Sequence, residues 1–125
     1  MGNNNWHLEE TYKSLIQISL VVMRFILIAN GGAAVALMAF AGNLYANKIE
    51  IPPCFKPAML CFLGGVTAGG FTCVFSYLTQ LTLYREERDK LGANKHHKYL
   101  YIAMCFAVLG VLLFGIGSWF GIHQL

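Results

Sequence analysis

The chain has 125 residues, of which 57% are hydrophobic and 12% are charged. A soluble domain of this size carries about 25% charged residues, so the composition excludes an ordinary water-soluble fold. The formal net charge of +3 comes from basic residues that flank long apolar segments. This arrangement favours contacts with anionic lipid and argues against nucleic acid as a partner.

Three apolar segments are long enough to cross a bilayer. They cover residues 25–46, 57–83 and 99–122, and a helix of about 20 residues crosses a hydrocarbon core about 30 Å thick. The sequence therefore predicts an all-α integral membrane protein with three transmembrane helices, in which residues 1–125 form a single membrane domain.

The first helix is expected to begin well before its apolar segment. Asn5 can cap it, and Glu9 and Glu10 suit the positive end of its dipole. A helix continuous from there to Ala46 would have about 41 residues and a length of roughly 60 Å, twice what a membrane needs. In its first part, residues that recur every three or four positions lie on one face and permit packing against partner helices. They are Leu8, Tyr12, Leu15, Ser19 and Val22.

Prolines and charged residues indicate where the helices end and the connections between them begin. Pro52 and Pro53 prevent helix continuation after the first segment, and Pro57 suits the first turn of the second helix. The second helix is expected to leave the membrane near Tyr84 and to continue as a charged helix to about Leu91, within a loop of residues 84–98.

Basic residues near the segment ends predict the orientation. Seven of them belong to the N-terminal segment and the loop, against two, Lys48 and Lys56, on the other side. Because cytoplasmic connections carry the excess of Lys and Arg, we expect a multi-pass inner-membrane protein with a cytoplasmic N-terminus and an external C-terminus. The basic residues of the loop either contact anionic lipid or a partner protein, or form a solvated helical extension: Arg85, Arg88, Lys90, Lys95 and Lys98.

Small residues recur at regular spacing in all three segments. Heptad-spaced positions are Gly65, Gly69, Thr72, Ser76 and Thr79 in the second, and Ala103, Gly110 and Gly117 in the third. Helices associate in lipid through close backbone approach and hydrogen bonds, so these faces can pack within one chain or between copies. Their number favours a homo-oligomer. The residues expected at helix contacts are Asn30, Gly31, Gly32, Gly65, Gly69, Thr72, Ser76, Gly117 and Gly121.

Polar side chains inside the segments are few. An amide in hydrocarbon needs a hydrogen-bonding partner, so Asn30 predicts an interhelical contact, with a pore-lining or ligand role as the alternative. Thr72, Ser76, Thr79 and Gln80 form a weakly polar path, although hydroxyls commonly bond to their own helix. No Asp, Glu, Lys or His lies deep in a segment, which argues against a proton relay, an ion-coupled transporter or a charged selectivity ring.

No catalytic, metal or cofactor site is predicted. The histidines that could ligate a haem between helices all fall outside the apolar segments: His7, His96, His97 and His123. No nucleophile–base pair, P-loop or dinucleotide fingerprint is present, so enzymatic activity is not expected.

The run LIANGGAAVALMAFAG, Leu27 to Gly42, resembles a segment of small prokaryotic membrane proteins. Some of these are similar to membrane components of anti-phage or CRISPR-associated systems. The resemblance covers 16 residues of one span. It implies an oligomeric membrane effector whose opening or membrane disturbance follows a cytoplasmic signal. Such effectors often carry a soluble sensor domain, and its absence from these residues implies a separate cytoplasmic partner protein.

These observations favour a self-associating inner-membrane protein with a pore-like or membrane-perturbing role, controlled from the cytoplasmic side. Two alternatives remain: a membrane anchor or accessory subunit of a larger complex, and a holin-like lysis protein. An anchor should purify with dissimilar subunits, whereas an effector should form a ring or bundle of itself.

Overall fold

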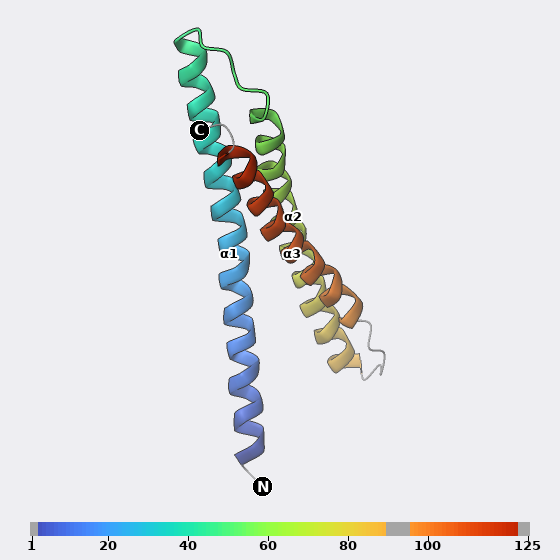
Figure 1. Ribbon diagram of the computed structural model, residues 1–125. Coiled ribbons are helices and arrows are strands. Elements are labelled where there is room, and N and C mark those ends of the chain that lie inside the picture. Colours follow the sequence, from blue (N-terminus) through green and yellow to red (C-terminus); the bar gives the residue numbers. More distant parts are fainter. Residues whose placement is uncertain (1–2, 90–95, 123–125) are drawn as a thin grey trace.

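The computed structural model describes residues 3–89 and 96–122. These residues form three helices, α1 (Asn3–Ala46), α2 (Phe55–Asp89) and α3 (His96–Ile122), as shown in Figure 1. Within the described ranges there is no strand. Each helix contains a stretch long and apolar enough to cross a membrane. The prediction of an all-α membrane protein with three transmembrane helices is therefore confirmed.

α1 is a single helix of 44 residues. It begins at Asn3, so Asn5 lies in its first turn and is not the cap that the sequence predicted. At a rise of 1.5 Å per residue the helix is about 66 Å long. Its N-terminal part extends past the end of the α2–α3 pair (Figure 1).

The end of α1 is formed without glycine. Lys48 has a φ of 57°, a left-handed conformation that usually favours glycine. Two backbone hydrogen bonds close the turn there. The N–H of Ile49 donates to the carbonyl of Leu44 at 2.9 Å, and the N–H of Lys48 donates to the carbonyl of Tyr45 at 3.1 Å. This is the Schellman pattern, and it satisfies carbonyls that the helix end leaves open.

As the sequence predicted, α2 continues past Tyr84 as a charged helix, and the structure describes it to Asp89, because Arg and Glu are good helix formers. Residues 96–98 of the expected loop begin α3. Nδ1 of His96 lies 2.7 Å from Oε2 of Glu86 and links the two helix ends. Of the five basic residues predicted as a contact surface, Lys90 and Lys95 lie outside the described residues.

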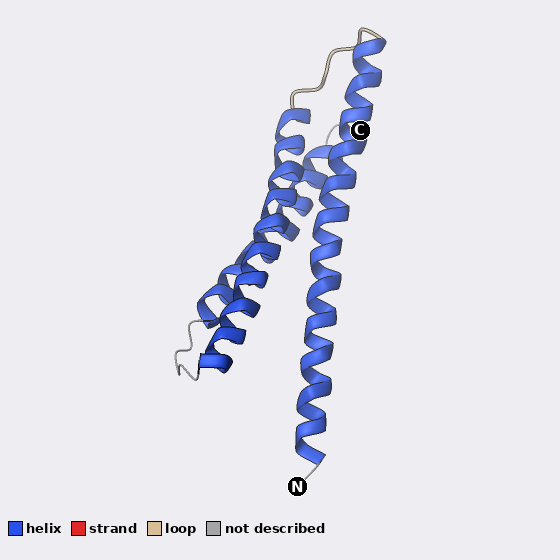
Figure 2. Cartoon of the chain, turned by 180° about the vertical axis from the view of Figure 1, so that it is seen from behind, coloured by secondary structure: helices blue, strands red, loops and turns tan. Residues whose placement is uncertain are grey.

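α2 and α3 form a close antiparallel pair, whereas α1 meets them only near its C-terminal half (Figures 1 and 2). The buried apolar cluster lies on that side and consists of Ala34, Ala58 and Phe62. Towards the N-terminus of α1 the two parts separate.

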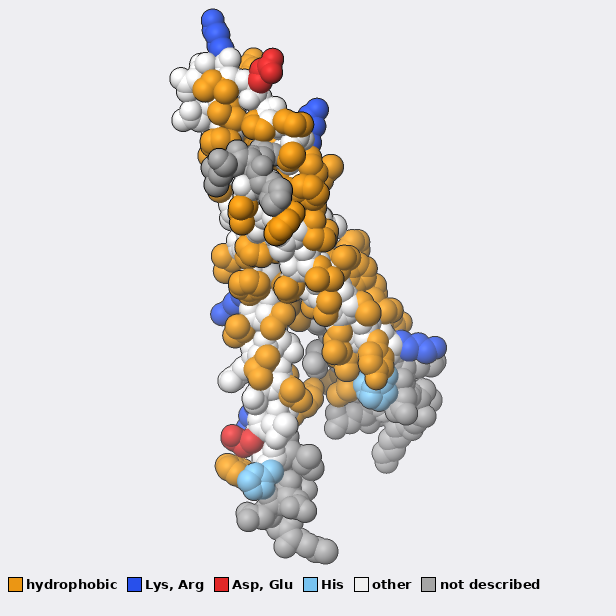
Figure 3. All heavy atoms as spheres, in the orientation of Figure 1, with side chains coloured by type: hydrophobic (Ala, Val, Ile, Leu, Met, Phe, Trp, Pro, Cys, Tyr) orange, Lys and Arg blue, Asp and Glu red, His pale blue; other side chains and the backbone are white. Residues whose placement is uncertain are grey.

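Most large apolar side chains lie on the surface, where Figure 3 shows them along the helices. Ile28 is 72% exposed and Leu60 is 70% exposed. Small residues, by contrast, fill the interior: Ala68, Ala103, Gly65, Gly69, Gly110 and Gly117 are buried. This distribution fits helices whose outer surface contacts lipid and whose backbones approach closely.

Candidate functional site

Asn30 lies where all three helices meet. Its side chain is fully buried. Nδ2 donates to the carbonyl of Ile26 in α1 at 2.9 Å and to the carbonyl of Gly110 in α3 at 3.2 Å. The second bond holds α1 against α3 in a region where no water competes for it.

The other end of the Asn30 amide faces Gly65 of α2. A Cβ atom at Gly65 would overlap Oδ1 of Asn30. Within the described part of the chain Oδ1 accepts no hydrogen bond. An oxygen so close to a glycine Cα makes at most the weak Cα–H···O contact known between packed helices. Asn30, Gly65 and Gly110 therefore form one tightly packed point, which we call the junction.

Ile26 extends the junction by one turn. A Cβ at Gly110 would lie 2.7 Å from Cγ2 of Ile26, and a Cβ at Gly69 would lie 3.1 Å from the same atom and 2.9 Å from Cδ2 of Leu27. All three separations are shorter than a carbon–carbon contact of 3.5–4.0 Å. α1 thus supplies bulk, and α2 and α3 supply glycines that make room for it.

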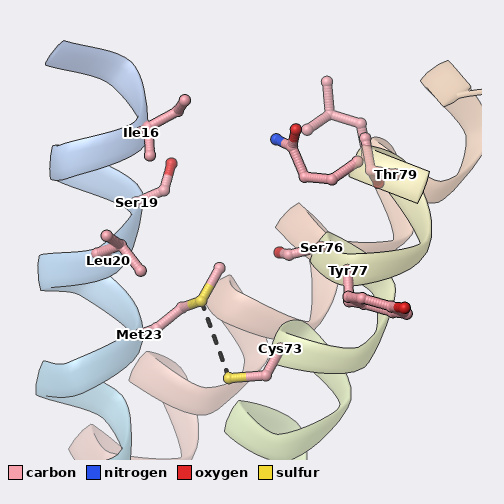
Figure 4. A pocket seen from close by; sticks show the side chains of 10 residues that line it. Ile16, Ser19, Leu20, Met23, Cys73, Ser76, Tyr77 and Thr79 are labelled. Carbon is pink, nitrogen blue, oxygen red and sulfur yellow. Dashed lines mark hydrogen bonds between the residues drawn. The ribbon is translucent and has the colours of Figure 1, made fainter. Parts of the chain in front are cut away.

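Beyond Ile26 the helices separate and leave a cavity between them that is open on one side, which we call the wedge. It has a volume of about 600 Å³. Its walls include Ile16, Ser19, Leu20 and Met23 of α1, Cys73, Ser76, Thr79 and Gln80 of α2, and Leu100 of α3 (Figure 4). At its narrow end Sγ of Cys73 lies 3.8 Å from Sδ of Met23. A second cavity of about 190 Å³ adjoins it and shares Ser19, Met23, Ser76 and Leu100.

The predicted polar path on α2 is only partly polar. Thr72 and Thr79 donate their hydroxyls to the carbonyls of Ala68 and Phe75, at 2.9 and 2.8 Å. Ser19, across the wedge, donates to Leu15 at 2.8 Å. These hydroxyls donate within their own helices, and the other two residues of the predicted path, Ser76 and Gln80, line the wedge.

The remaining predicted contact residues divide into packed and open positions. A Cβ at Gly117 would meet the Phe62 ring at 3.0 Å, and one at Gly31 would touch Val66 at 3.9 Å. At Gly32 and Gly121 no atom lies within 4 Å of the position that a Cβ would take. Among the basic residues, Arg85, Arg88 and Lys98 are exposed.

Two residues at the junction, Ile26 and Gly110, were not among the helix contacts expected from the sequence. The spacing of Ala103, Gly110 and Gly117 indicated that Gly110 lies on a packed face, but not that its carbonyl accepts from Asn30. Ile26 is one of many apolar residues in its segment, and no sequence signal distinguishes it from Ile28, which is exposed.

Residues 3–89 and 96–122 contain no group of three His, Cys, Asp or Glu side chains placed to hold a metal ion. No protein-family model, curated protein or solved structure matches this chain.

Proposed function

We propose that the chain is a self-associating membrane protein and that α1 provides the contact between copies. The supporting observation is an open stripe of small residues on α1. It holds Gly32, Ala36, Ala39 and Asn43, which are spaced by four, three and four residues and are all exposed. That spacing places them on one side of the helix, away from Asn30.

Gly32 carries this argument because packing within the chain does not explain it. Gly65, Gly69, Gly110 and Gly117 each have a neighbour within 3.2 Å of the position that a Cβ would take, whereas Gly32 has none within 4 Å. A glycine costs helix stability relative to alanine. In lipid, a glycine and an alanine four residues apart let a second helix approach closely.

The role that fits such an assembly is that of a pore-like or membrane-perturbing effector, controlled from the cytoplasmic side. A pore would need several copies, because Thr72 and Thr79 use their hydroxyls within α2. Control is supported by the N-terminal part of α1, which extends past α2 and α3 (Figure 1). This part exposes Trp6, Tyr12 and Leu15, which a cytoplasmic partner protein could cover. An inner-membrane location and a part in anti-phage defence belong to the same proposal.

Replacing Gly32 by leucine is expected to dissociate the oligomer, since the leucine side chain would separate the two backbones. Native mass spectrometry and chemical cross-linking in a mild detergent would measure the change. Gly70→Leu is the matched control: Gly70 also has no atom within 4 Å of the Cβ position, but Val66 and Val74 lie four residues to either side of it, so it belongs to no stripe of small residues. A monomer for the unaltered chain in several detergents would overturn the proposal. Copurification with dissimilar subunits would instead support an anchor or accessory subunit.

The orientation is tested separately. A reporter inserted at Gly92 should be cytoplasmic and a reporter after Leu125 external, because seven basic residues flank one side and two the other. Reporter enzymes that are active in only one compartment would read this out. If both fusions report the same side, the proposed orientation is wrong.

A further inference from the structure

We draw no further inference here: the strongest candidate, the open apolar groove between α1 and the α2–α3 pair that Met23, Cys73, Ser76 and Leu100 line, carries none because nothing in the structure shows what covers it.

Discussion

Gly65→Ala should lower the free energy of unfolding by about 1–3 kcal/mol, the usual cost of overpacking a well-packed interior. A Cβ at this position overlaps Oδ1 of Asn30, and Asn30 cannot move aside without losing its bond to Gly110. Since α1, α2 and α3 meet there, the strain falls on all three helices. Unfolding by sodium dodecyl sulfate in mixed micelles, followed by circular dichroism, would measure the change.

Gly70→Ala is the control for this substitution. It lies on the same helix with no atom within 4 Å of its Cβ position, so we expect a change of at most about 0.5 kcal/mol. Adding Asn30→Ala to Gly65→Ala should relieve part of the strain, because the overlapping atoms are removed. The double variant should therefore be more stable than the sum of the two single effects predicts. Equal effects of Gly65→Ala and Gly70→Ala would refute the close packing at the junction.

Asn30→Asp is expected to be the most damaging single substitution at the junction. It removes both donated hydrogen bonds and places carboxyl oxygens against the carbonyls of Ile26 and Gly110. An aspartate near the centre of a transmembrane helix costs about 2.5–3.5 kcal/mol on insertion scales. Asn30→Ala should cost less, about 1–2 kcal/mol for the lost interhelical bond, with a further contribution from the cavity it leaves.

The ranking of these variants separates a polar role of Asn30 from a purely space-filling one. The same micelle unfolding measurement applies to both. Thr67→Ala and Thr67→Asp are the controls, since Thr67 is exposed two residues after Gly65 on α2 and its hydroxyl donates to the carbonyl of Leu63 in its own helix. If Asn30→Asp, which keeps the volume of the side chain, costs nothing measurable while Asn30→Ala does, the junction depends on space filling and the hydrogen bond to Gly110 contributes nothing measurable.

The position of the junction gives α1 two different environments. On the C-terminal side of Asn30, Ala34 packs against Ala58 and Phe62. On the N-terminal side, α1 faces the wedge and then extends past the other helices.

The three helices could be predicted from the sequence alone. Length and apolar composition are local properties, so the three transmembrane segments and the proline-rich break at Pro52 and Pro53 could be predicted without knowledge of packing. Spacing also determined which small residues share a face, as with Gly65, Gly69 and Thr72. The turn at Lys48 could not be predicted in this way, because it uses a left-handed residue that is not glycine.

Which faces of the three helices meet could be learned only from their packing in three dimensions. A glycine-rich face serves contacts within a chain and contacts between chains equally well, so sequence could not separate Gly65, which faces Asn30, from Gly32, which is open. The partner of Asn30 was equally undetermined, because any carbonyl of a neighbouring helix satisfies an amide. The wedge was not predictable either: it results from the angle between α1 and α2, and that angle depends on where Ile26 and Asn30 contact the glycines of the other two helices.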